Sequence, residues 1–235
     1  MLNPNLHRQT MLQILKDIYS DSSLGSYLGF KGGTAVYLLY NLPRFSVDLD
    51  FDLLDSTKED LVFKKIQNIL AQYGKLEETA NKHYTLFYLL NYKSGFQKLK
   101  IEISKRPSLS SYETKQFLGL PMLVMVTSDM FAHKLTALTE RKQLANRDLF
   151  DIHFFFKQNW IVNIPLLEKR TQLTYQDYLK KCIQIIERVY PESTLANMGE
   201  LVDNKTKSWI KNHLKEEVLF LLKINLTSNN PQTNF

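Results

Sequence analysis

The sequence FKGGTAVYLLYNLPRFSVDLDFDLLD, residues 30–55, holds the features from which the fold of this 235-residue chain can be inferred. It contains the chain's one adjacent pair of glycines, Gly32 and Gly33, directly before an apolar run at 34–40 that predicts a buried helix. Glycines at that position let the backbone approach a bound group, and the free N–H groups of a helix N-terminus favour phosphate. On its own the pair is better explained as an ordinary turn, so its weight depends on the residues after the helix.

The second half of the stretch alternates apolar and polar residues over 45–54, which predicts a strand. The alternation places Asp48, Asp50 and Asp52 on one face. Strands disfavour aspartate, and like charges in a row repel each other. A divalent cation with a preference for hard oxygen ligands, Mg²⁺ or Mn²⁺, would explain the three acids. A solvated, acidic edge strand is the alternative.

Two further strands are predicted at 85–90 and 99–104, separated by a turn. In the second of them, LKIEIS, Glu102 is the one acid among apolar neighbours. A carboxylate on a strand beside the aspartates could complete a metal site or act as a general base. An exposed strand glutamate is the simpler explanation of Glu102 taken alone.

The remaining segments read as helices and connections. Amphipathic helices are predicted at 6–20 and 58–73, the short apolar segment 24–30 as a helix or a strand, 105–120 as an irregular loop, and 121–126 as an edge strand. Beyond these the chain is mostly helical, with segments at 174–190 and 194–223 and a polar tail. We therefore expect a core at 1–120 and a helical domain at 121–235.

Four charged residues of the helical part are candidates for a site. Lys134 lies in a helix capped by residues 127–129, and Arg147, Asp148 and Asp151 open the next helix. Asp148 and Asp151 are three residues apart and share a helix face. A snorkelling lysine, helix capping and a salt bridge are the structural alternatives.

Composition limits the class of protein without identifying it. The net charge of +6 is compatible with nucleotide or RNA partners. A single cysteine, Cys182, rules out an internal disulfide framework and suits a reducing cytosol. We find no signal peptide, no apolar run long enough to span a membrane, and no histidine spacing typical of a metal site. The expected location is cytoplasmic.

Taken together, the motifs resemble those of a known family. They are Lys31-Gly32-Gly33-Thr34-Ala35, then Arg44-Phe45-Ser46-x-Asp48-Leu49-Asp50-Phe51, then Lys134, and then Arg147-Asp148-x-x-Asp151. In this order they resemble the AbiEii family of nucleotidyltransferase toxins, MenA-like members included, which belong to type IV toxin–antitoxin and phage-defence systems. The resemblance covers about residues 28–155.

The resemblance implies an α+β fold with a polymerase-β-like core, a small mixed sheet flanked by helices, followed by a helical C-terminal part. It implies that Gly32 and Gly33 contact a nucleoside triphosphate, that Asp48 and Asp50 bind Mg²⁺ with Glu102 as third carboxylate, that Lys134 contacts the phosphates and that Asp148 is a further acid. The other motif residues, Lys31, Thr34, Ser46 and Arg147, would take part in nucleotide binding. The implied partners are an NTP, an RNA acceptor such as tRNA, and an antitoxin encoded nearby.

Two other functions remain open at this point. The fold could serve as a non-catalytic module that binds a protein or RNA, or the enzyme could transfer a nucleotide to a small molecule or a protein. Three aspartates on one strand face favour an enzyme, because a pure binding module has no need of them.

Overall fold

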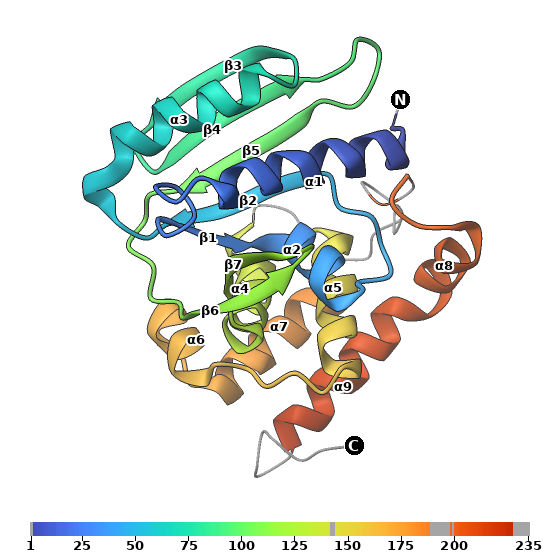
Figure 1. Ribbon diagram of the computed structural model, residues 1–235. Coiled ribbons are helices and arrows are strands. Elements are labelled where there is room, and N and C mark those ends of the chain that lie inside the picture. The colour runs from blue at the N-terminus through green and yellow to red at the C-terminus, as the bar shows by residue number, and fades with distance from the viewer. Residues whose placement is uncertain (1, 142–143, 189–197, 199, 228–235) are drawn as a thin grey trace. The chain divides into compact units, whose positions relative to one another are not determined.

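A computed structural model of the protein describes residues 2–141, 144–188, 198 and 200–227 (Figure 1). Contacts between Cα atoms divide the chain into two compact units, Met1–Val126 and Thr127–Phe235. The segment at 121–126, which the sequence analysis assigned to the second domain, lies within the first unit. No helix in the described part of the chain is both long and apolar enough to cross a membrane.

The first unit is built around one mixed sheet of seven strands in the order β3-β4-β5-β2-β1-β7-β6. The strands are β1 (Leu28–Lys31), β2 (Asp48–Leu53), β3 (Lys75–Lys82), β4 (Thr85–Asn91), β5 (Leu99–Ser104), β6 (Tyr112–Phe117) and β7 (Leu120–Met125). The central β2 runs antiparallel to β1 and parallel to β5. The predicted α+β fold with a mixed sheet and flanking helices is confirmed.

The alternation of the central strands gives the sheet one apolar and one polar face. Leu49 pairs with Ile101 and Phe51 with Ile103, and all four are buried. On β4, the other neighbour of β5, Tyr88 also pairs with Ile101. Its hydroxyl donates a 3.0 Å hydrogen bond to the Phe63 carbonyl of helix α3 (Glu59–Ala71). The apolar face is therefore the face that α3 covers.

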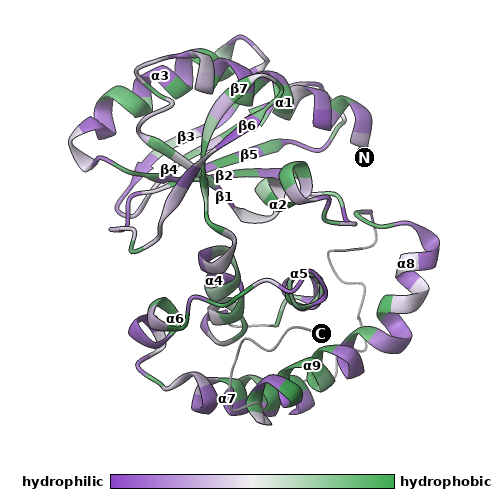
Figure 2. Ribbon diagram, turned by 60° about the horizontal axis from the view of Figure 1, so that its bottom comes forward, coloured by the Kyte–Doolittle hydropathy of each residue, from purple (hydrophilic) through white to green (hydrophobic). Residues whose placement is uncertain are grey.

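Three helices complete this unit: α1 (Pro4–Ser20), α2 (Gly32–Tyr40) and α3 (Glu59–Ala71), with a short 3₁₀ turn, η1 (Ser56–Lys58), before α3. Figure 2 shows α1 and α3 on one side of the sheet and α2 on the other. The acidic residues of β2 thus lie on the face that α2 approaches. The predicted helices at 6–20, 34–40 and 58–73 are confirmed to within a few residues.

Three expectations about the strands are wrong. The loop expected over 105–120 contains β6, and β3 was not predicted. These are the two edge strands of the sheet. None of their residues is buried and most are polar, so backbone hydrogen bonds rather than an apolar alternation define them. The segment at 121–126 forms β7, which is an interior strand between β1 and β6.

The second unit is helical in its described part. Its elements are α4 (Thr127–Glu140), α5 (Asn146–Lys157), α6 (Ile164–Thr171), α7 (Tyr175–Arg188), α8 (Asn204–Trp209), the π-helical turn η2 (Ile210–Leu214) and α9 (Lys215–Thr227). Of the segments predicted as helical at 174–190 and 194–223, residues 189–190, 194–197 and 199 lie outside the described part.

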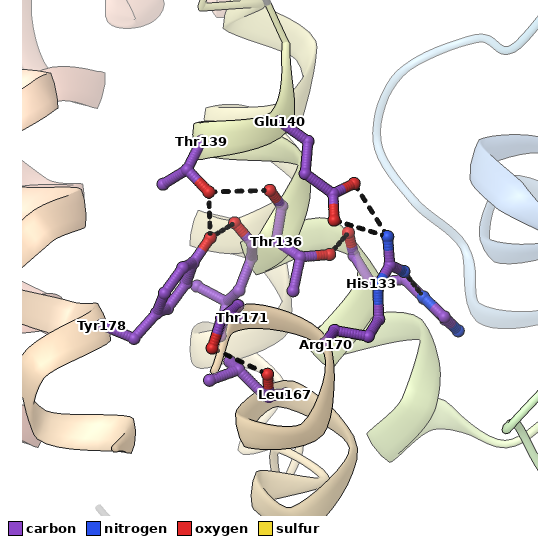
Figure 3. Close-up of polar contacts among 9 residues, drawn as sticks. His133, Thr136, Thr139, Glu140, Leu167, Arg170, Thr171 and Tyr178 are labelled. Carbon is purple, nitrogen blue, oxygen red and sulfur yellow. Dashed lines mark hydrogen bonds and ion pairs between the residues drawn. The ribbon is translucent and has the colours of Figure 1, made fainter. Parts of the chain in front are cut away.

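Polar contacts join α4 to the helices that follow it (Figure 3). The Tyr178 hydroxyl donates a 2.8 Å hydrogen bond to the Leu135 carbonyl and lies 3.1 Å from the Thr139 hydroxyl. Arg170 of α6 donates to both carboxylate oxygens of Glu140 at 2.8 Å. Because Tyr178 is fully buried, these contacts hold α4, the helix that carries Lys134, in one position against α7.

Candidate active site

The polar face of the sheet brings together the three carboxylates that the sequence analysis selected. Asp48 and Asp50 lie on β2, and Glu102 lies on β5 directly opposite Asp50 in the strand register. Because side chains of residues paired in register point to the same face, all three share that face. The prediction that Glu102 lies on a strand adjacent to the aspartates is confirmed.

Lys100 is a member of this cluster that the sequence analysis missed. It pairs in register with Asp48, and its Nζ lies 3.4 Å from Asp48 Oδ2 and 3.1 Å from Glu102 Oε2. The signal was present in the sequence, because Lys100 precedes Glu102 by two residues and so shares its face.

Asp50 lies in an unfavourable environment for a negative charge. Burial raises the pKa of its carboxyl to about 6, and repulsion by Asp48 and Glu102 acts in the same direction, against the opposing influence of Lys100 and Lys31. For Lys100, burial lowers the pKa, but the attraction of Asp48, Glu102 and Asp50 outweighs it and the net shift is upward. The cluster therefore has more negative charge than its one lysine neutralises.

Asp52 shares the face but has a different role. Its two carboxylate oxygens each accept a 2.5 Å hydrogen bond, one from Lys31 Nζ and one from the Tyr112 hydroxyl. Gly29 makes room for the Tyr112 ring, since a Cβ there would overlap it. Asp52 is thus fully engaged in joining β2 to β1 and β6. Lys31, for which nucleotide binding was predicted, therefore has its ammonium paired with Asp52.

The glycine pair lies at the start of α2, against the acidic strand. Gly32 is the first helical residue, with a φ of +79°, and a Cβ there would lie 2.5 Å from Asp50 Oδ2. A Cβ at Gly33 would lie 2.7 Å from an Arg44 nitrogen. The turn therefore needs glycine for both conformation and space, and it places a helix N-terminus beside the carboxylates.

Thr34 and Ser46, both predicted to bind nucleotide, are buried and contact each other. Thr34 Oγ1 donates to the Asp48 carbonyl and lies 2.9 Å from Ser46 Oγ. These contacts fix the backbone at the beginning of β2 and so orient Asp48.

His7 of α1 supports the same part of β2 and was not predicted. Its Nε2 lies 2.9 Å from the Val47 carbonyl and its Nδ1 lies 2.8 Å from the Tyr92 hydroxyl. Because a carbonyl only accepts hydrogen bonds, Nε2 carries the proton and Nδ1 accepts from Tyr92. Burial lowers the pKa of His7, which keeps the ring in this neutral form.

The helical unit contains a second cluster, formed by residues of α4 and α5. Lys134 Nζ lies 3.0 Å from an oxygen of Asp148 and 3.0 Å from an oxygen of Asp151, and Arg141 Nε lies 2.7 Å from the other Asp148 oxygen. Both aspartate side chains are 0% exposed. The salt bridge considered from the sequence is present, and Arg141 is an additional member. Arg147, next to Asp148, is partly exposed.

Asp48, Asp50 and Glu102 are the residues that could hold a divalent cation. They offer carboxylate oxygens on one face, and the pKa of Asp50 is raised by burial and by the charges of Asp48 and Glu102, both of which a bound cation would offset. Among the described residues, no three His, Cys, Asp or Glu side chains are already arranged to enclose a metal ion. Lys100 instead bridges two of the three carboxylates.

Comparison with known proteins identifies the family. Residues 13–218 match the family described as "Nucleotidyl transferase AbiEii toxin, Type IV TA system". The chain belongs to the AbiEii family. It is therefore a member of a family of nucleotidyltransferase toxins that act in toxin–antitoxin systems, and such a system includes an antitoxin partner. A search of curated protein sequences gives no significant match.

Solved structures show the same fold. The crystal structure of JHP933 from Helicobacter pylori is similar with a TM-score of 0.64 and 22% identity, over 96% of this chain and 94% of that one. MenT4, a nucleotidyltransferase toxin from Mycobacterium tuberculosis, is similar with a TM-score of 0.55 and 19% identity, over 95% and 93% of the two chains.

Substitution of Gly32 tests how closely the turn must approach Asp50. Gly32→Ala should remove activity and lower the free energy of unfolding by about 1–3 kcal/mol, because the methyl group would strain the left-handed φ and collide with the carboxylate. Gly95 is a matched control with the same φ of +79° and no atom within 4 Å of a Cβ. Gly95→Ala should lower the free energy of unfolding only by the cost of the backbone strain, and it should leave activity intact. Equal activity of the two variants would show that the close approach at Gly32 is dispensable.

Proposed function

We propose that this AbiEii-family protein is a Mg²⁺-dependent toxin that transfers a nucleotide from an NTP to an RNA acceptor, tRNA in particular. The observation that supports it most is the convergence of Asp48, Asp50 and Glu102 on one face of the sheet, beside the glycine turn. Mn²⁺ is the alternative cation. Phage defence is the biological role we infer for such a toxin, and we propose that its antitoxin is encoded nearby.

Each group in the first unit has a place in this proposal. The three carboxylates would hold the cation, which when bound activates the attacking oxygen and neutralises charge on the triphosphate. The first turn of α2 directs backbone N–H groups toward the triphosphate, and glycine there allows close approach. His7 holds the backbone at Val47, directly before β2, and Thr34 holds it at Asp48, so they orient the first carboxylate.

The second cluster enters the proposal through the family resemblance. Lys134 would contact nucleotide phosphates, Asp148 would be a further acid, and Arg147 would take part in nucleotide binding. The ion pairs of Lys134 with Asp148 and Asp151 hold its ammonium in a defined position. A positive charge fixed in this way stabilises developing negative charge without reorganisation.

The RNA acceptor is supported by charge. The chain has 30 Lys and Arg residues against 24 Asp and Glu, a net charge of +6, which favours association with a polyanion. A small molecule or a protein hydroxyl would not require that excess. Total tRNA is therefore the first acceptor to test.

The proposal is tested by incubating the protein with each of the four labelled NTPs, total tRNA and Mg²⁺. We expect label on RNA with at least one NTP, loss of labelling with EDTA, and no labelling by Asp48→Ala. Equal labelling by wild type and Asp48→Ala would refute the assigned site. If RNA is unlabelled and calorimetry finds no Mg²⁺-dependent NTP binding at millimolar concentration, the protein is a binding module rather than an enzyme.

A further inference from the structure

Lys100 occupies an unusual position for a lysine beside a candidate metal site. Its ammonium lies within ion-pair distance of Asp48 and Glu102, two of the three carboxylates proposed to hold the cation. It comes from β5, in register with Asp48, so the strand pairing itself directs the side chain to this place. A lysine that only faced solvent would not be bonded to both acids.

We propose that the Lys100 ammonium is a built-in counter-ion that bridges Asp48 and Glu102 in the metal-free protein and competes with the divalent cation for them. Lys100 thereby sets the metal affinity. The inference rests on the proposed metal-dependent function, because it assigns Asp48, Asp50 and Glu102 as the ligands.

The electrostatics of the face explain why a counter-ion is needed. Asp48 and Asp50 on β2 and Glu102 on β5 lie on one face of the sheet, where their like charges repel one another. One ammonium relieves part of this repulsion. A divalent cation relieves more of it and prefers the same carboxylate oxygens, so it can bind only when Asp48 and Glu102 exchange Lys100 for the metal.

The Lys100 side chain is suited to such an exchange. It is 33% exposed, and lysine carries its charge on a flexible four-carbon stem. Lys31, the other lysine on this face, is fixed differently, because its partner Asp52 is only 6% exposed and is also bonded to Tyr112. The two lysines therefore have the same charge on the same face, with Lys31 in register with Asp50, but only Lys100 bridges Asp48 and Glu102.

This difference provides a matched pair of variants, Lys100→Met and Lys31→Met. Titration of nucleotide-free protein with Mn²⁺ by calorimetry should show binding to Lys100→Met that is at least about tenfold tighter than binding to wild type. Lys31→Met removes one positive charge from the same face without removing the bridge, so its affinity should change much less. Lys100→Arg keeps the bridging charge and should bind Mn²⁺ no more tightly than wild type.

Thermal unfolding provides a second measurement that does not depend on activity. In EDTA, Lys100→Met should melt below wild type, because the carboxylates have lost their counter-ion. Addition of Mg²⁺ should raise the Tm of Lys100→Met by more than that of wild type, so that the gap closes. If Lys100 had a packing role alone, Lys100→Met would lower the Tm to the same extent with and without Mg²⁺.

The outcomes separate this inference from the proposed function. Tighter binding by Lys100→Met alone, with a Tm restored by Mg²⁺, supports the exchange. Mn²⁺ affinity that is unchanged in Lys100→Met, or raised equally in Lys31→Met, overturns the inference and leaves the metal site intact. Absence of Mn²⁺ binding by wild type and all variants would instead refute the metal-dependent function itself.

Discussion

Asp50→Asn is expected to lower nucleotidyl transfer by about 10³-fold or more while the first unit stays folded. Asparagine has the size of aspartate but supplies no negative charge to a divalent cation. The measurement is RNA labelling under single-turnover conditions, with circular dichroism to confirm the fold. Transfer within tenfold of wild type would exclude Asp50 as a ligand.

The difference in stability between this variant and wild type should depend on pH in a defined direction. The pKa of Asp50 is raised from 3.8 to about 6, so the protonated carboxyl is the form that the folded state prefers. The protonated Asp50 carboxyl therefore contributes to the stability of wild type fully below pH 3.8, and this contribution is lost as the pH rises through about 6. In EDTA, Asp50→Asn should therefore be at least as stable as wild type at pH 7, and the difference should shrink toward pH 4. Urea unfolding at several pH values measures it, and a variant less stable than wild type at pH 7 would contradict the expectation.

Asp52 provides the contrast on the same strand face. Asp52→Asn should lower the free energy of unfolding by about 1–3 kcal/mol, because the amide cannot accept hydrogen bonds from both Lys31 and Tyr112. It should not reproduce the loss of transfer seen with Asp50→Asn. Neighbouring aspartates on one strand would then be distinguished by function, one in catalysis and one in structure.

Lys134→Met is expected to have the largest effect on stability, about 3–5 kcal/mol of unfolding free energy. Lys134 pairs with Asp148 and Asp151, whose side chains are both 0% exposed. Its removal leaves Asp151 without this counter-ion and Asp148 with the partly exposed Arg141. Chemical denaturation followed by the fluorescence of Trp160 and Trp209, both in the helical unit, measures the loss.

Two further variants show whether the cost arises from the buried charges. Lys134→Arg keeps a cation and should recover much of the stability, although the bulkier guanidinium prevents full recovery. In the double variant Lys134→Met with Asp151→Asn, the buried charge that Lys134 no longer balances is removed, so this variant should be more stable than Lys134→Met alone. A double variant whose loss equals the sum of the single losses would show that the two residues are not coupled. Loss of activity in Lys134→Met is informative only together with these measurements.

Much of the first unit was predictable because its signals are local. The alternation at 45–54 and 99–104 identified β2 and β5, and the period of apolar residues identified α1 and α3. The edge strands β3 and β6 were missed because they bury no residue and their side chains carry no apolar period. The position of β7 was misjudged because strand order depends on pairing between distant segments, and no local pattern records it.

The same distinction applies to the candidate site. The sequence was sufficient to show which carboxylates share a face, since a strand has a period of two, and to show that glycines precede a helix beside them. The contacts that each of these residues makes depended on the tertiary fold. The fold paired Asp52 with Lys31 and Tyr112, set Lys100 between Asp48 and Glu102, and placed Gly32 against Asp50. The physical reason is that hydrogen bonds and ion pairs act over a few ångströms, and it is the pairing of strands distant in sequence that brings those atoms within reach.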